Sequence, residues 1–146
     1  MCTPAVDFEE LQTTLWWGWR IMKYLCVVFV DEKKMAALSS SESQRLDDAS
    51  LGYDETLRKG GHLVAAQALE PARQASTVRV RNGKVIVIDG PFTETKEQMG
   101  GFLLIEARDR EEAMELASNV PVARYGTIEV RAVKELVASG NRATAL

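Results

Sequence analysis

The sequence predicts an α+β fold of the ferredoxin-like kind, and three observations support this prediction. Residues 24–30 and 101–107 are almost continuously apolar, which is typical of strands at the centre of a sheet. Each is followed by a helical pattern and then by a weaker strand pattern, and a hairpin pattern separates the two βαβ units. Right-handed crossovers then place the two apolar strands in the middle of one sheet, with both helices on one face.

The first βαβ unit contains a helix with clear end signals. Ser39 and Glu42 have the spacing of a capping box, and apolar residues recur at helical intervals up to Gly60-Gly61. The expected buried stripe consists of Leu46, Ala49, Tyr53 and Leu57. Residues 63–69 follow as a weaker strand that Pro71 ends.

Residues 77–81 and 84–88 are predicted to form a hairpin. Asn82-Gly83 between them is typical of a type I′ turn, which also fixes the register of the two strands. One face then carries four valines: Val78, Val80, Val85 and Val87. Arg79 and Arg81 share the other face, either to hold an anionic ligand or as a solvated edge that resists aggregation.

The second βαβ unit repeats these signals. Asp109 and Glu112 are placed to cap a helix, which Pro121 ends. Its expected buried stripe consists of Ala113, Leu116, Ala117 and Val120. Residues 127–133 alternate between apolar and charged side chains, as an edge strand does.

One face of the predicted sheet is left without helices. Because the central strands are apolar in both directions, this face is expected to be covered by a second copy of the chain, by the hairpin, or by both. The leading expectation is a homodimer that closes a shared, partly hollow α+β barrel. Pockets form where such a cover is imperfect and a few polar groups converge.

Composition limits the classes of function. The chain has 146 residues, 46% of them hydrophobic and 27% charged, which suits one globular domain. A formal net charge of -3 argues against direct binding to nucleic acid. Two cysteines, Cys2 and Cys26, indicate no disulfide framework and favour a reducing cytoplasm. With a single histidine and no CxxC spacing, we expect no metal and no cofactor.

The two ends of the chain differ from its centre. Residues 1–21 hold all three tryptophans, Trp16, Trp17 and Trp19, and fit neither a signal peptide nor a membrane span. They are either a native N-terminal extension or a mis-assigned start, with translation beginning at Met22. The domain is expected to cover residues 22–134, and residues 135–146 are expected to be a flexible tail.

The loop between the hairpin and the second central strand is the predicted site. In the run from Asp89 to Glu97, Gly90 and Pro91 form a rigid turn beside four ionisable side chains. Asp89 is a candidate catalytic carboxylate, or else a residue that caps the turn. The candidate ligand-binding residues are Pro91, Phe92, Glu94, Lys96 and Glu97. The charged members are alternatively a solvated loop that forms ion pairs with itself.

Three further residues are candidates outside this loop. His62 is a possible proton shuttle because the ordinary histidine pKa is near neutrality, or it is a surface residue at the start of an edge strand. Arg124 and Tyr125 either line a cleft or pack in a loop.

The segment from Asp89 to Gln98, followed by Gly100-Gly101-Phe102, closely resembles the signature of the DGPF (DGPFAETKE) proteins within the YCII-related superfamily. Residues 77–84 and 123–131 support this resemblance, which covers roughly residues 22–134. The resemblance implies a dimeric α+β barrel, in agreement with the fold predicted above.

The resemblance implies two functions of different classes. Many YCII-related proteins are suspected enzymes because a histidine on the first helix and an aspartate lie together in a cleft. Here that helix has no histidine, since His62 follows Gly60-Gly61. The first expectation is a small molecule bound in the dimer's cleft, with acid–base catalysis left open. The alternative is an accessory module in transcription that acts through a protein partner such as an extracytoplasmic-function sigma factor.

Overall fold

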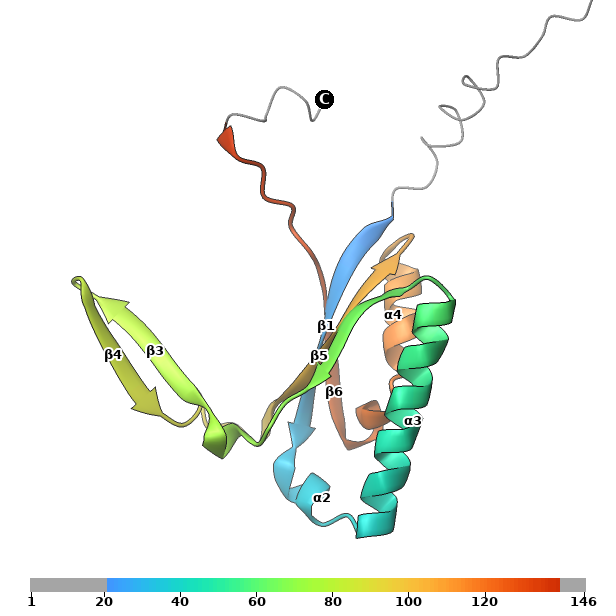
Figure 1. Cartoon of the computed structure of the whole chain (residues 1–146), viewed down its shortest axis with the longest axis horizontal. Coiled ribbons are helices and arrows are strands. Elements are labelled where there is room, and N and C mark those ends of the chain that lie inside the picture. Colours follow the sequence, from blue (N-terminus) through green and yellow to red (C-terminus); the bar gives the residue numbers. More distant parts are fainter. Residues whose placement is uncertain (1–20, 140–146) are drawn as a thin grey trace, which may run out of the picture.

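The computed structural model describes residues 21–139 and contains a four-stranded antiparallel sheet of order β2-β5-β1-β6 (Figure 1). The strands are β1 (Met22–Asp31), β2 (Leu63–Ala68), β5 (Glu97–Ala107) and β6 (Gly126–Ala132). Helix α3 (Ser40–Lys59) connects β1 to β2, and helix α4 (Arg110–Ser118) connects β5 to β6. Both helices lie on one face of the sheet. The predicted ferredoxin-like fold is confirmed, with the two most apolar strands at the centre.

The ends of both helices follow the sequence signals. The Ser39 hydroxyl accepts a hydrogen bond from the Glu42 amide (3.2 Å), and the Glu42 carboxylate accepts one from the Ser39 amide (2.8 Å). This capping box satisfies two backbone donors at the start of α3. Asp109 caps α4 by accepting from the Glu112 amide at 2.8 Å. After α3 the chain turns at Gly61, whose φ of +78° favours glycine.

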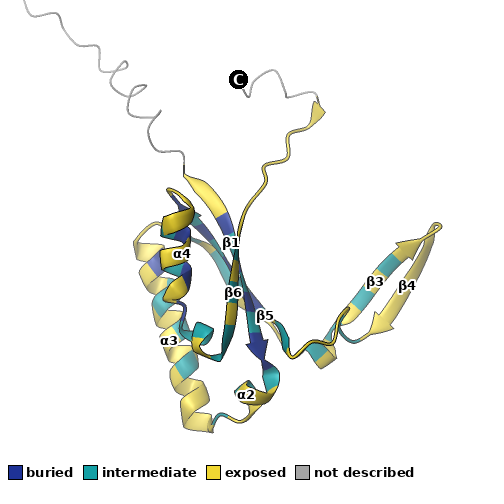
Figure 2. Ribbon diagram, turned by 180° about the vertical axis from the view of Figure 1, so that it is seen from behind, coloured by how far each residue is buried: buried dark blue, intermediate teal, exposed yellow. Residues whose placement is uncertain are grey.

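The core lies between the sheet and the two helices. Alternate residues of β1 and β5 point toward the helices and are buried, as the strand period of two requires (Figure 2). The core is formed by Tyr24, Cys26, Val28, Val30, Leu57, Leu103, Ile105, Ala107, Ala113, Ala117 and Val120. Leu116, Ile128 and Val130 pack against it, so the predicted stripes of α4 and β6 are largely confirmed. Ala49 of the predicted α3 stripe is exposed.

No helix of residues 21–139 lies on the opposite face of the sheet. Leu25 lies across from Leu104, and Val27 across from Phe102, so these side chains point to the same side of the sheet. The apolar residues of this uncovered face are Leu25, Val27, Phe29, Phe102 and Leu104. None of them belongs to the core cluster.

The hairpin of β3 (Ser76–Arg81) and β4 (Lys84–Asp89) forms a separate two-stranded sheet. Its register is the predicted one, and Asn82 and Gly83 have positive φ angles, as a type I′ turn requires. The hairpin projects from the domain, and Figure 1 shows it standing apart from the four-stranded sheet. Cover by the hairpin was one of the predictions for the uncovered face, and the hairpin does not cover this face of its own chain.

Within residues 21–139, three short helices were not predicted from the sequence. They are α2 (Glu32–Ala36), η1 (Ala72–Gln74) and η2 (Pro121–Tyr125). They are too short to show a helical period. Helix α2 begins where the buried Asp31 carboxylate accepts from the amides of Lys33 (3.0 Å) and Lys34 (3.4 Å). Pro121 ends the α-helical pattern as predicted, but it also starts the 3-10 helix η2.

Residues 1–20 and 140–146, with the three tryptophans and most of the predicted tail, lie outside the described residues. Residues 133–138 belong to no helix or strand. Among residues 21–139, no helix combines the length and the apolar character that crossing a membrane requires.

Candidate functional site

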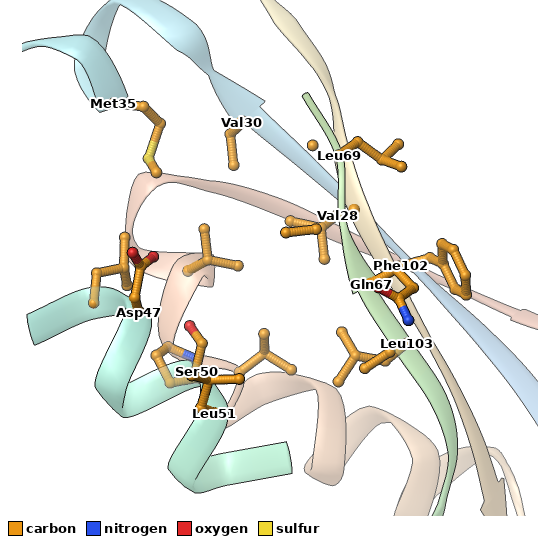
Figure 3. A pocket seen from close by; sticks show the side chains of 18 of the residues that line it. Val28, Val30, Met35, Asp47, Ser50, Leu51, Gln67, Leu69, Phe102 and Leu103 are labelled. Atoms are coloured by element: carbon orange, nitrogen blue, oxygen red, sulfur yellow. The ribbon is translucent and has the colours of Figure 1, made fainter. Parts of the chain in front are cut away.

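A cavity of about 940 Å³ lies between α3 and the helix-facing side of the sheet (Figure 3). Its floor is the edge of the core, formed by Val28, Val30, Leu103 and Val120. Helix α2 contributes Met35, and η1 and η2 complete the walls. A predominantly apolar pocket with a few polar groups is the usual form of a small-molecule site.

The cavity exists because small residues line its sheet wall. Gly100 and Gly101 at the start of β5, with Ala66 and Ala68 of β2, face a helix that packs closely only near its C-terminal end. There Leu57 is buried, whereas Leu46 and Ser50 nearer the N-terminus are only half-buried. No large side chain of residues 21–139 fills the space between the N-terminal half of α3 and the sheet.

Acidic residues dominate the polar lining. Four carboxylates line the cavity, and Arg73 supplies the one cationic side chain among its lining residues. The carboxylates belong to Glu32, Asp47, Asp54 and Glu70. Figure 3 shows Asp47, Ser50 and Gln67 around the open space. The lining therefore disfavours an anionic ligand and favours a neutral or cationic one.

Two of these carboxylates have defined environments. Glu32 accepts a hydrogen bond from the Ala72 amide at 2.7 Å, which ties α2 to η1 at the cavity wall. Asp54 is half-buried, and desolvation raises its pKa, while the nearby Arg58 acts in the opposite direction. A carboxyl group with a raised pKa is suited to proton transfer.

The predicted site, the loop 89–98, lies outside this cavity. Its turn is held by neutral groups: the Thr77 hydroxyl donates to the Gly90 carbonyl (2.9 Å), and the Gly90 amide donates to the Ala75 carbonyl (2.7 Å). The Gln98 side chain donates to the carbonyls of Thr93 (2.9 Å) and Thr95 (3.1 Å). Asp89 ends β4 and is exposed, and within residues 21–139 its carboxylate does not cap the turn.

The other residues of the loop have different environments. Phe92 is 72% exposed, and the Arg79 guanidinium lies 5.0 Å from the centre of its ring. Glu94 and Lys96 are exposed and form no ion pair with any residue the structure describes. Glu97 accepts from the Thr127 hydroxyl at 2.9 Å. Among the described residues, the charged side chains of the loop form no ion pair with one another. Pro91 is half-buried.

His62 lies at the other end of β5. Its Nδ1 is 2.8 Å from the Glu106 carbonyl, which can only accept, so Nδ1 carries the hydrogen. The Glu106 amide donates in return to the His62 carbonyl at 2.8 Å. Because β5 rises about 3.4 Å per residue, roughly 30 Å separates this position from Glu97. Within one chain, His62 and Asp89 are not brought together.

A second groove of about 510 Å³ adjoins the first between α3 and η2. Arg45, Arg124 and Tyr125 are among its lining residues, so the two positions predicted near Gly126 do lie in a groove. Leu46 and Val120 border both openings. Among residues 21–139, no three potential metal ligands come together.

Comparison with known proteins identifies the family. The model of the YCII-related domain matches residues 22–137. The chain belongs to the YCII-related family. An uncharacterised protein of Rhizobium meliloti (strain 1021) is 35% identical over 112 residues, which covers 75% of this chain and 90% of that relative. The predicted YCII-related membership of this chain is confirmed, and the relative is described only as uncharacterised.

The sequence reasoning did not single out the cavity residues of this YCII-related chain. A signal for them was present, because Asp47, Ser50 and Asp54 follow one another at helical spacing on one side of α3. The sequence also contains Gly100-Gly101 and the alanines of β2, but these small residues indicate a cavity wall only because they face this part of α3. Only the packing of distant segments turns these small residues into a cavity wall.

Proposed function

We propose that this YCII-related protein binds a small molecule in the cavity between α3 and the sheet, and that it acts as a homodimer. The observation that carries the proposal is the cavity itself. Its volume of about 940 Å³ is in the range of ligand sites. Val28, Val30 and Leu103 give it an apolar floor, and polar groups of α3 stand at its side.

The lining favours a ligand with an apolar body and a neutral or cationic polar group. Asp47 is the best anchor for such a group, because it lines the cavity and is not committed to a hydrogen bond with any described residue. Glu32, in contrast, already accepts from the Ala72 amide. Asp54 is the candidate for acid–base chemistry, since burial raises its pKa.

The homodimer accounts for the uncovered face of the sheet. A contiguous apolar surface on this face is only half-buried by the described part of the chain; it consists of Leu25, Val27, Phe29, Phe102 and Leu104. A second copy of the chain would cover this face in a symmetric dimer. Asp89 and His62 remain candidates for catalysis only in a site shared by two chains. The loop 89–98 is also our reason to place the chain in the DGPF branch of the family.

Matched ligands and matched variants test the cavity. We expect 3-phenylpropylamine to shift amide resonances of residues 47–54 in an NMR titration, and 3-phenylpropionate to shift them less. Asp47→Asn should weaken amine binding at least fivefold. Asp48→Asn removes the same charge from the next residue, which accepts from Gln44 and does not line the cavity, and should leave binding unchanged. Equal effects of the two variants, or no shifts near α3, would refute the proposal.

A second candidate function is docking to a protein partner through the loop 89–98. Phe92 favours it, because a 72% exposed aromatic side chain outside the cavity is typical of a contact surface. Glu94 and Lys96 follow Phe92 in the loop, are exposed, and form no ion pair with any described residue. An extracytoplasmic-function sigma factor encoded in the same genome should then bind the wild-type protein and lose affinity for Phe92→Ser. Unchanged affinity would exclude this role for the loop.

We also propose that the protein is cytoplasmic. The free, buried thiol of Cys26 supports this location, because reduced cysteines are usual in that compartment.

A further inference from the structure

The β3–β4 hairpin exposes an apolar face that is large for its size. Its four valines, Val78, Val80, Val85 and Val87, are 58–66% exposed. The hairpin projects from the domain, and Figure 2 shows it exposed along most of its length. Isolated two-stranded hairpins are marginally stable in water, and exposed apolar patches of this kind mark interaction surfaces. This face therefore needs a cover.

The described part of the same chain does not supply that cover. The hairpin leaves the domain at Ala75 and returns at Gly90, and it extends away from the sheet between them (Figure 1). Six-residue strands reach about 20 Å, which is enough to reach a neighbouring molecule.

Net charge favours a second copy of the chain as the neighbour. The hairpin carries Arg79, Arg81 and Lys84 against Asp89, a net charge of +2. The whole chain has a net charge of -3, so its remainder carries -5. A cationic arm is attracted over long range to the anionic remainder of another copy. The contact itself would be apolar, because on the uncovered face Lys23 and Arg131 are balanced by Glu106 and Glu129.

We propose that the hairpin is an arm that packs its valine face along the uncovered sheet face of a second copy of this chain. Two-fold symmetry gives each protomer the arm of the other, so both unmatched apolar surfaces are covered at once. This inference rests on the proposed homodimer and adds a specific contact to it. The Arg79–Phe92 contact lies on the opposite face of the arm and stays accessible.

Excision of the arm tests its contribution to the dimer. The hydrogen bond of 2.7 Å between the Gly90 amide and the Ala75 carbonyl shows that the two ends of the arm are adjacent. A Gly-Ser linker can therefore replace residues 76–89. Sedimentation equilibrium should give a dimer dissociation constant at least tenfold higher than that of the wild type, with unchanged helical circular dichroism.

A photo-crosslinker locates the contact without deleting anything. Benzoylphenylalanine in place of Val85 should yield covalent dimers joined to peptides that contain residues 24–29 or 99–105. The same label in place of the neighbouring Ile86, on the other face of β4, should yield few. Three outcomes would overturn the proposed arm contact while leaving the dimer intact. They are crosslinks only within one chain, equal yields at both positions, or an unchanged dissociation constant after excision. A wild-type protein that stays monomeric would overturn both.

Discussion

Burial changes the chemistry of single residues in this protein. Cys26 is 1% exposed in the middle of β1, and desolvation raises the pKa of its thiol to about 11. Asp54 lies at the cavity wall, and partial burial raises the pKa of its carboxyl group. In both cases the low-dielectric surroundings disfavour the charged form. The Cys26 thiol is therefore unreactive, whereas the Asp54 carboxyl group keeps its proton to a higher pH than an exposed aspartate does.

The Cys26 thiol should be protected from alkylation while the protein is folded. In a Cys2→Ser background Cys26 is the remaining thiol, and its raised pKa leaves almost no thiolate at pH 8. Iodoacetamide labelling followed by mass spectrometry should be at least a hundredfold slower than in urea-unfolded protein. Equal rates in the two states would show that β1 opens freely.

The raised pKa of Asp54 predicts a defined pH dependence of stability. The folded state holds the Asp54 proton to higher pH than the unfolded state, whose aspartate pKa is about 3.9. The free energy of unfolding should therefore fall as pH rises from that value through the folded pKa. Asp54→Asn should flatten this part of the profile and be no less stable at pH 7. Asp48→Asn serves as the control, and urea unfolding from pH 3.5 to 8 measures both.

Close approach between elements depends on glycine at two positions. A side-chain carbon at Gly101 would lie 2.6 Å from the Gln67 carbonyl of the neighbouring strand β2. One at Gly126 would collide with the Phe29 carbonyl, where β6 meets β1. The φ angle of Gly126 is that of extended backbone, so the requirement is for space and not for conformational freedom. Sheet pairing, and not local preference, demands these glycines.

Gly126→Ala should lower the free energy of unfolding by about 1–3 kcal/mol, the usual cost of forcing extra atoms into packed structure. Gly52→Ala is the matched control, since an added carbon at Gly52 meets nothing within 4 Å in the interior of α3. It should instead stabilise the protein by roughly 0.5–1 kcal/mol. Urea denaturation measures both variants, and a stabilising Gly126→Ala would contradict the observed approach of β6 to β1.

At the scale of the whole molecule, the described residues 21–139 leave two apolar surfaces without a packing partner. One is the uncovered sheet face, and the other is the valine face of the β3–β4 hairpin. The cavity lies on the opposite side of the sheet, beneath α3. Binding of a small molecule and association of two chains therefore use mainly opposite sides of the sheet, with Phe102 bordering both surfaces.

Val27→Lys should convert the proposed dimer into a folded monomer. Val27 is central in the uncovered face, and Glu129 lies directly across from it on β6, so a lysine is tolerated in the monomer. Light scattering coupled to size exclusion should show half the wild-type mass, with unchanged circular dichroism. Met114→Lys places the same charge on the outer side of α4 and should leave the mass unchanged. A dimeric Val27→Lys protein would exclude this face as the interface.

Local signals in the sequence predicted most of the fold because they act over a few neighbouring residues. The capping box at Ser39, the turn at Asn82-Gly83 and the alternation in β6 each depend on short segments, and each is found in the structure. The start of β5 at Glu97 was missed, since it depends on pairing with Asp31, which is distant in the sequence. The predicted site at Asp89 and His62 combined residues that one chain keeps apart.

By itself, the sequence determined the order of strands and helices, the central position of the two apolar strands, the register of the hairpin and the family. The tertiary structure decided where the hairpin stands, that residues 21–139 leave one sheet face uncovered, and that a cavity opens beside Asp47 and Asp54. The physical reason is the distance along the sequence between the residues that interact. Caps, turns and periodicity are set by neighbours along the chain, whereas a cavity is the space left where distant segments, α3 and the glycine-rich start of β5, fail to fill it.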